Sequence, residues 1–159
     1  HLAGAAGTVT GAALTRLIGG KTDIVMMLNG ALAGLVAITA EPLTPGPITA
    51  MIIGSIGAVI MYLGTKLLES YRIDDVVGAI PVHMFAGIFG TLVVPLTNGD
   101  TSFGTQLIGV ISVCIFSFVL SWITFSTLKA TVGLRISKAA EKLGTDKAEV
   151  GVTAYSIRD

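Results

Sequence analysis

One histidine inside an apolar segment has the residue type and the depth needed to handle a proton or a small polar molecule. His83 follows Asp75 by eight residues, which is about 12 Å along a helix at 1.5 Å per residue. If the segment crosses a bilayer, an ionisable side chain at that depth is costly and usually marks a substrate path or a partner. A neutral imidazole can donate from one ring nitrogen and accept at the other. The sequence therefore favours a conducting or relaying role for His83 over the alternative of holding helices together.

The polar residues around this histidine have simpler interpretations. Asp74 and Asp75 precede its helix, where carboxylates accept hydrogen bonds from free N–H groups, and we favour this role over direct contact with a cation. Pro81 has no N–H and loosens the turn, which either repositions His83 or is a tolerated kink. Asn29, in an earlier apolar segment, is expected to make an interhelical hydrogen bond.

Five apolar segments must position these side chains, and we expect each to be a membrane-spanning helix. Hydrophobic residues make up 52% of the chain and charged residues 13%, against roughly 25% charged residues in soluble domains. Four of the segments have about the 17–25 residues that cross a bilayer. The first is short, and we interpret it as the remainder of a helix in a fragment. The predicted fold is an all-α polytopic membrane helix bundle in residues 1–133, followed by a tail in 134–159, with spans at about 2–18, 24–40, 48–68, 76–97 and 104–132.

The positive charges are all on one side of these predicted spans. The loops 41–47 and 98–103 contain no Lys or Arg. All ten lie on the opposite side, at the ends of the segments, in the other connections or in the tail, which predicts a cytoplasmic C-terminus. The formal net charge of zero gives no indication of a nucleic-acid partner.

Cys114 is the single cysteine, so neither a disulfide framework nor a cysteine metal cluster is expected. No metal or cofactor is predicted, and an enzyme is unlikely because there is no nucleotide-binding motif and no pocket-forming titratable pair.

Small residues recur inside the segments at helical spacing. Gly30 and Gly34 form a G-x-x-x-G pair, and further small residues follow at Ala50, Gly54, Ala58, Gly87 and Gly90. In lipid, small residues let helix backbones approach closely, so bundle packing is the favoured interpretation. The alternative is that some of them leave room for a narrow permeation path.

Three stretches together resemble the ammonium transporters of the Amt/Mep/Rh family. The run Met27-Leu-Asn-Gly-Ala-Leu-Ala-Gly-Leu-Val-Ala-Ile-Thr39 is similar to a motif of its seventh-to-eighth helix region. Ile73-Asp-Asp-Val-Val-Gly-Ala-Ile-Pro-Val-His83, followed by Ala86-Gly-Ile-Phe-Gly-Thr-Leu92, resembles the tenth-helix signature. Gly133-Leu-Arg135, Gly144-Thr-Asp146 and Ala154-Tyr155 are similar to the cytoplasmic tail. The resemblance covers nearly the whole chain.

The resemblance implies helices seven to eleven and the tail of an eleven-helix, inverted-repeat, homotrimeric transporter in the plasma (cytoplasmic or inner) membrane. His83 would be the second of the family's twin pore histidines, and Ala79 and Leu32 would line the pore. Asp74 and Asp75 would mark its cytoplasmic mouth. Ammonium would lose its proton, and ammonia would pass the paired histidines in a hydrophobic pore.

The tail is where the resemblance implies regulation. Gly144, Asp146 and Tyr155 would pack on cytoplasmic loops, and a PII-type signalling protein would be the partner. Val150 and Val152 replace a His and a Glu of the family pattern, and a solvated amphipathic turn over 139–147 is an equal alternative. An alternative function is an ammonium-sensing membrane domain coupled to a cytoplasmic signalling module.

Overall fold

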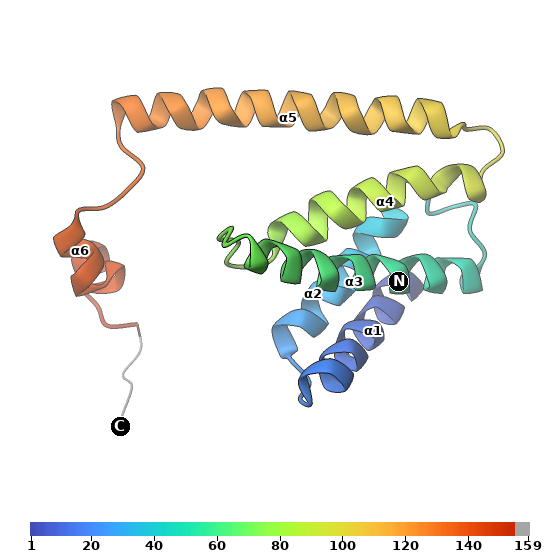
Figure 1. Cartoon of the computed structure of the whole chain (residues 1–159), viewed down its shortest axis with the longest axis horizontal. Helices are drawn as coiled ribbons and strands as arrows, with labels where there is room; N and C mark the ends of the chain where they lie inside the picture. The colour runs from blue at the N-terminus through green and yellow to red at the C-terminus, as the bar shows by residue number, and fades with distance from the viewer. Residues whose placement is uncertain (155–159) are drawn as a thin grey trace. The chain divides into compact units, whose positions relative to one another are not determined.

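The computed structural model describes residues 1–154, and this part of the chain is built from helices and turns without strands, which confirms the all-α prediction (Figure 1). In chain order the elements are α1 (Leu2–Gly19), α2 (Ile24–Thr39), α3 (Pro47–Ser70), the π-helix η1 (Ile80–Phe85), α4 (Ala86–Val93), the 3-10 turn η2 (Val94–Leu96), α5 (Phe103–Thr131), α6 (Lys138–Leu143) and the π-turn η3 (Asp146–Val150).

Two of these helices are both long and apolar enough to cross a membrane, α3 with 24 residues and α5 with 29. Helix α2 and the stretch Ile80–Leu96 are apolar but shorter, with fewer than 18 residues each. The fourth segment becomes helical later than the predicted residue 76, because Val76 and Val77 form a turn and Gly78 has a φ of 74°. The predicted kink at Pro81 is a π-helical turn, after which α4 continues as regular α-helix.

The chain divides into two compact units, His1–Ser112 and Val113–Asp159. In the first unit α1, α2 and α3 pack against one another, and α2 also contacts η1 and α4 (Figure 1). A small apolar core between α2, α3 and the η1–α4 segment consists of Ala33, Met61, Val82 and Ala86. Helix α5 begins in the first unit, continues into the second and has no buried residue. In the described part of the second unit, α6 contacts η3.

Glycines set the distance between α1, α2 and α3. A Cβ placed on Gly30 of α2 would lie 2.6 Å from the carbonyl oxygen of Gly7 in α1. A Cβ on Gly54 of α3 would lie 2.6 Å from the Cα of Ala3. Real side chains do not tolerate such distances, so these helices contact each other through backbone atoms. This is the close approach that small residues allow in membrane bundles.

Capping bonds fix where the helices begin. The carboxylate of Asp23 accepts a 3.0 Å hydrogen bond from the N–H of Met26 at the start of α2. The N–H of Asp23 in turn donates to the buried Thr15 hydroxyl of α1 at 3.2 Å. This bond links the start of α2 to the last turns of α1. Helix α3 begins at Pro47, a position where the missing proline N–H costs no intrahelical bond.

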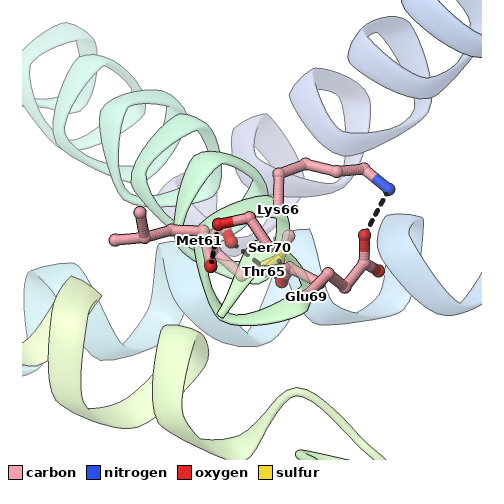
Figure 2. Close-up of polar contacts among 6 residues, drawn as sticks. Met61, Thr65, Lys66, Glu69 and Ser70 are labelled. Carbon is pink, nitrogen blue, oxygen red and sulfur yellow. Dashed lines mark hydrogen bonds and ion pairs between the residues drawn. The ribbon is translucent and has the colours of Figure 1, made fainter. Parts of the chain in front are cut away.

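The C-terminal end of α3 satisfies its polar side chains within its own turns (Figure 2). The Thr65 hydroxyl donates to the carbonyl oxygen of Met61 at 3.0 Å, and the Ser70 hydroxyl donates to that of Leu67 at 2.7 Å. Lys66 and Glu69 form a 2.9 Å ion pair on the exposed side. These bonds allow polar residues to end an otherwise apolar helix.

Candidate functional site

His83 lies in the π-helical turn η1, directly beside the core. Its neighbours Pro81 and Val82 are buried, with Val82 exposed by 2%, whereas His83 and Ala79 are exposed in this chain. Ala79 precedes His83 by four residues, about one turn, so both side chains emerge from the exposed side of the segment. In η1, Pro81 and Val82 therefore pack against the bundle, whereas the imidazole of His83 points away from the core.

Asp75 holds the start of this turn. Its Oδ1 accepts from the N–H of Ala79 at 2.9 Å, and its Oδ2 accepts from the N–H of Ile80 at 2.8 Å. These are two of the N–H groups that a helix start leaves without an intrahelical partner. Among the described residues, Asp74 makes no side-chain hydrogen bond that corresponds to these. Of the two predicted mouth residues, Asp75 has the geometry of a helix cap.

Asn29 contacts the same entrance turn from the other side. It is nearly buried in α2, exposed by 9%, and its Nδ2 donates to the carbonyl oxygen of Val77 at 2.9 Å. The adjacent Gly78 has a left-handed φ of 74°, and a Cβ there would lie 2.7 Å from Asn29 Nδ2. Both facts favour glycine at this position. The expected interhelical bond of Asn29 is therefore made to the turn before η1 rather than to a helix.

Leu32 lies one turn after Asn29 on α2 and is 47% exposed, while Ala33 beside it is fully buried. The predicted pore-lining residues Ala79, His83 and Leu32 are thus all exposed in this chain. They come from two different elements, α2 and the η1 segment.

A pocket in the first unit lies beside the entrance turn rather than at His83. The residues that line it come from the end of α3 and from the turn after it: Thr65, Leu68, Glu69, Ile73, Asp74, Asp75, Gly78 and Pro81. His83 does not line this pocket.

The tail residues singled out from the sequence fall in the second unit. The Asp146 carboxylate lies close enough to Gly144 that a Cβ there would be 2.6 Å from Oδ1, and Gly144 has a φ of 95°. Asp146 Oδ2 accepts from the N–H of Ala154 at 2.9 Å. This bond, with a second from the N–H of Lys147, lowers the pKa of Asp146 below its usual value. Tyr155 lies outside the described residues.

Sequence reasoning missed two features of the first unit. Gly7 and Gly11 of α1 contact α2 at the backbone, with a Cβ on Gly11 only 2.7 Å from the carbonyl oxygen of Met26. Their G-x-x-x-G spacing was the available signal. Glu41, in the loop before α3, accepts a 3.0 Å hydrogen bond from the side-chain amide of Asn98. The two residues are 57 positions apart, and no local sequence pattern predicts that they meet.

A family model described as Ammonium Transporter Family matches residues 1–155. The chain is 40% identical to ammonium transporter Amt2 of Archaeoglobus fulgidus, over 98% of this chain and 37% of the relative. It is 32% identical to an ammonium transporter of Corynebacterium glutamicum, over 98% of this chain and 38% of that protein. A solved structure named Sensor Amt Protein matches with a TM-score of 0.84 and 31% identity, over 93% of this chain and 40% of that one.

The chain therefore spans about two fifths of the length of these relatives. Relatives and family are named for transport rather than for an enzymatic reaction, which agrees with the prediction from the sequence. Because the family model matches nearly the whole sequence, this chain belongs to the ammonium transporter family, as its motifs predicted.

Proposed function

We propose that the protein moves ammonium across a membrane, and that this chain supplies one wall of the conducting path. The observation that carries the proposal is the family match over residues 1–155, combined with an imidazole, His83, displayed on an otherwise apolar segment. The relatives Amt2 of Archaeoglobus fulgidus and the Corynebacterium glutamicum protein are named ammonium transporters.

The chemistry follows from the cost of charge in an apolar path. A bare ammonium ion loses its hydration in such a path, and an uncompensated charge there is expensive. Transfer of the proton to an imidazole leaves ammonia, which is neutral and needs a hydrogen-bonding partner. Relay of that proton along the imidazoles, and its return to ammonia at the far end, would carry the one net charge that a current measures. The His83 ring can offer one nitrogen as donor and one as acceptor. A second imidazole, which the family resemblance assigns to a helix outside this sequence, would continue the path.

The remaining residues of the proposed path would shape it. Ala79 and Leu32 would narrow the passage and exclude water beside His83. Asp75 would hold the cytoplasmic mouth in shape through its two backbone bonds, with Asp74 next to it.

The proposed setting of the path is a multi-pass protein of the plasma membrane. The five predicted spans would cross it, the C-terminus would be cytoplasmic, and three copies would associate as a homotrimer. Gly144, Asp146 and Tyr155 would contribute a regulatory tail for a PII-type partner.

The test is an ammonium-induced current from the complete protein in a supported membrane, compared with its His83→Ala form. Met84→Ala is the matched control, because Met84 is a neighbouring exposed side chain that cannot exchange a proton. We expect the current to fall at least about a hundredfold in His83→Ala, the lower end of the 10²–10⁴ that a positioned proton-handling group contributes, and to persist in Met84→Ala. An unchanged current in well-folded His83→Ala would contradict the proposed role of His83.

A sensing role is the second candidate, because a structurally similar protein is named Sensor Amt Protein. A sensor would bind ammonium without sustained transport. Saturable ammonium binding by folded protein that gives no current and no uptake would favour sensing. A current that depends on His83 would favour transport.

A further inference from the structure

We propose that the C-terminal half of α5 binds an anionic phospholipid, whose acyl chain lies in an aromatic groove and whose phosphate contacts Lys129. The groove lies within the second unit and has a volume of about 320 Å³. Phe118, Trp122 and Phe125 line its length, and Lys129 and Leu134 line its end. The inference takes α5 to be the membrane-spanning helix that its length and hydropathy predict, and it does not depend on the proposed conduction of ammonium.

The sequence of α5 places these side chains on one face of the helix. Trp122, Phe125 and Lys129 follow Phe118 at steps of four, three and four residues, which is the spacing of neighbours along an α-helix. The three aromatic side chains are exposed by 57–72%. After the helix, the chain turns at a glycine with a φ of 86°, which brings Leu134 to the end of the groove. The result is an open apolar groove with a cation at one end.

The length of the groove matches the depth of one bilayer leaflet. Phe118 and Lys129 are 11 residues apart, which is about 16 Å along a helix. One leaflet contributes about half of the roughly 30 Å of hydrocarbon in a bilayer. Residues 101–128 contain no charged side chain, so Lys129 is the first charge that α5 reaches at its C-terminal end. A lipid in the groove would therefore have its chain beside the aromatic rings and its headgroup at Lys129.

The charge at the end of the groove selects the sign of the headgroup. Within residues 1–154, Lys129 makes no ion pair, whereas Arg135 pairs with Glu141 at 3.0 Å. No Asp or Glu is among the described residues that line the groove. Side chains of an α-helix lean toward its N-terminus, so the Lys129 ammonium lies over the groove rather than beyond it. A phosphate can accept a charge-assisted hydrogen bond from this ammonium.

The composition of the groove favours a lipid over another helix. Helices α1 to α3 contact each other through glycines, such as Gly7 and Gly30, where the backbones touch. Small residues of this kind are what brings helices together in lipid. The described residues that line the groove include neither glycine nor alanine. A flexible hydrocarbon chain can fill the spaces between large aromatic rings, which a helix backbone cannot approach closely.

The experiment measures which lipid lies beside Trp122 in the complete protein. Trp122 is the single tryptophan of this sequence, and subtracting the spectrum of Trp122→Phe removes the signal of any tryptophan elsewhere. The protein is placed in vesicles of equal parts phosphatidylcholine and phosphatidylglycerol, with brominated acyl chains on one lipid or on the other. Bromine quenches the fluorescence of an indole that it contacts. The ratio of the two quenching levels gives the relative affinity of the anionic lipid at this position.

Three substitutions test the assignment to Lys129. We expect the parent protein to prefer phosphatidylglycerol about fivefold, which is what one lysine beside an anionic lipid contributes. The preference should fall below about twofold in Lys129→Gln and persist in Lys129→Arg. Lys138→Gln is the matched control, because Lys138 carries the same charge in the same unit and does not line the groove. Its preference should equal that of the parent.

The other outcomes would each overturn the inference. Equal quenching by both brominated lipids in the parent would mean ordinary contact with the bilayer, without selection of a headgroup. Absence of quenching by either lipid would mean that protein covers Trp122. An equal loss of preference in Lys138→Gln and Lys129→Gln would assign the preference to the overall charge of the tail. Transport is measured separately by the ammonium-induced current, so none of these results decides on the proposed function.

Discussion

The glycines of helices α1 to α3 and the glycines of α5 have different structural consequences, although all lie in apolar helices. Gly7 and Gly30 bring α1 and α2 together at the backbone, and a Cβ on Gly30 would lie 2.6 Å from a carbonyl oxygen. In α5, no atom of the described residues outside the helix backbone lies within 4 Å of a Cβ placed on Gly109. Residue type and hydropathy are shared by the two regions. Within these helices, packing requires a glycine only where a second helix meets it.

The side-chain hydrogen bonds of the two compact units also differ. In the first unit, Asn29 bonds to Val77 and Asn98 bonds to Glu41, across 48 and 57 residues. In the described part of the second unit, the side-chain bonds are local, such as Arg135 to Glu141 across six residues and Asp146 to Ala154 across eight. Side-chain hydrogen bonds therefore join distant segments in the first unit, whereas in the tail they stabilise local turns.

The largest expected effect comes from replacing a glycine at the helix contact. Gly30→Leu should destabilise the protein by about 3 kcal/mol, because the side chain would have to push the α1 backbone away. Gly19→Leu, the same substitution at the end of α1 where a Cβ would meet no atom within 4 Å, should change stability by less than about 0.5 kcal/mol. Thermal unfolding of the detergent-solubilised variants, followed by circular dichroism, measures both. Equal losses would mean that the contact of Gly30 with α1 does not stabilise the protein.

A smaller effect is expected at the entrance turn of η1. Asp75→Ala should cost about 1–2 kcal/mol, since it removes the acceptor of two backbone N–H groups. Asp74→Ala is the matched control, and its cost should stay below about 0.5 kcal/mol. Denaturant titration of both variants would show the difference. A greater loss from Asp74→Ala would reverse the assignment of the cap.

A pH dependence is expected at the loop contact of the first unit. The N–H of Leu43, at 3.0 Å, and then the Asn98 amide lower the pKa of Glu41 below its usual value of 4.5. A lowered folded-state pKa means that the contact contributes stability above about pH 4.5 and loses it as the pH falls through the folded value. The melting temperature of the parent protein should thus fall more on acidification from pH 5 to about pH 3 than that of Glu41→Gln. Parallel curves for the two proteins would contradict this contact.

The smallest effect is expected in the tail. The N–H of Ala154 and then that of Lys147 lower the pKa of Asp146, so this local turn should also weaken as the pH falls through the folded value. Carboxylate NMR titration of the parent protein should show a pKa below the usual 3.8. Gly144→Ala should raise it, because Gly144 has a φ of 95° and a Cβ would crowd Oδ1. A titration at the usual value in both proteins would mean that the turn is open in solution.

Much of the fold could be predicted from the sequence because membrane helices are long and apolar. Helices α1, α2, α3 and α5 begin and end within about two residues of the apolar segments of the sequence, and helix ends are uncertain by about that much. Whether each of them spans a membrane stays a prediction. The start of the fourth segment was predicted too early, at residue 76. Hydropathy continues through Val76 and Val77, while the backbone turns at Gly78.

The candidate site was only partly predictable. His83 stands out because an ionisable residue in an apolar segment is rare, and Asp75 stands out by its place before a helix. The partner of Asn29 could not be predicted, because the bond joins residues 48 apart through a turn whose geometry depends on Gly78 and Pro81.

The sequence alone determined the helical, membrane type of this protein and its family, and it predicted His83 as the residue for conduction. These follow from local composition and from motifs, which require no knowledge of the packing. Only the tertiary structure decided which glycines are contact points, which aspartate caps η1 and which carbonyl Asn29 satisfies. Each of these depends on two segments meeting in space, and the free energy of a close approach or a buried hydrogen bond exists only once both partners are in place.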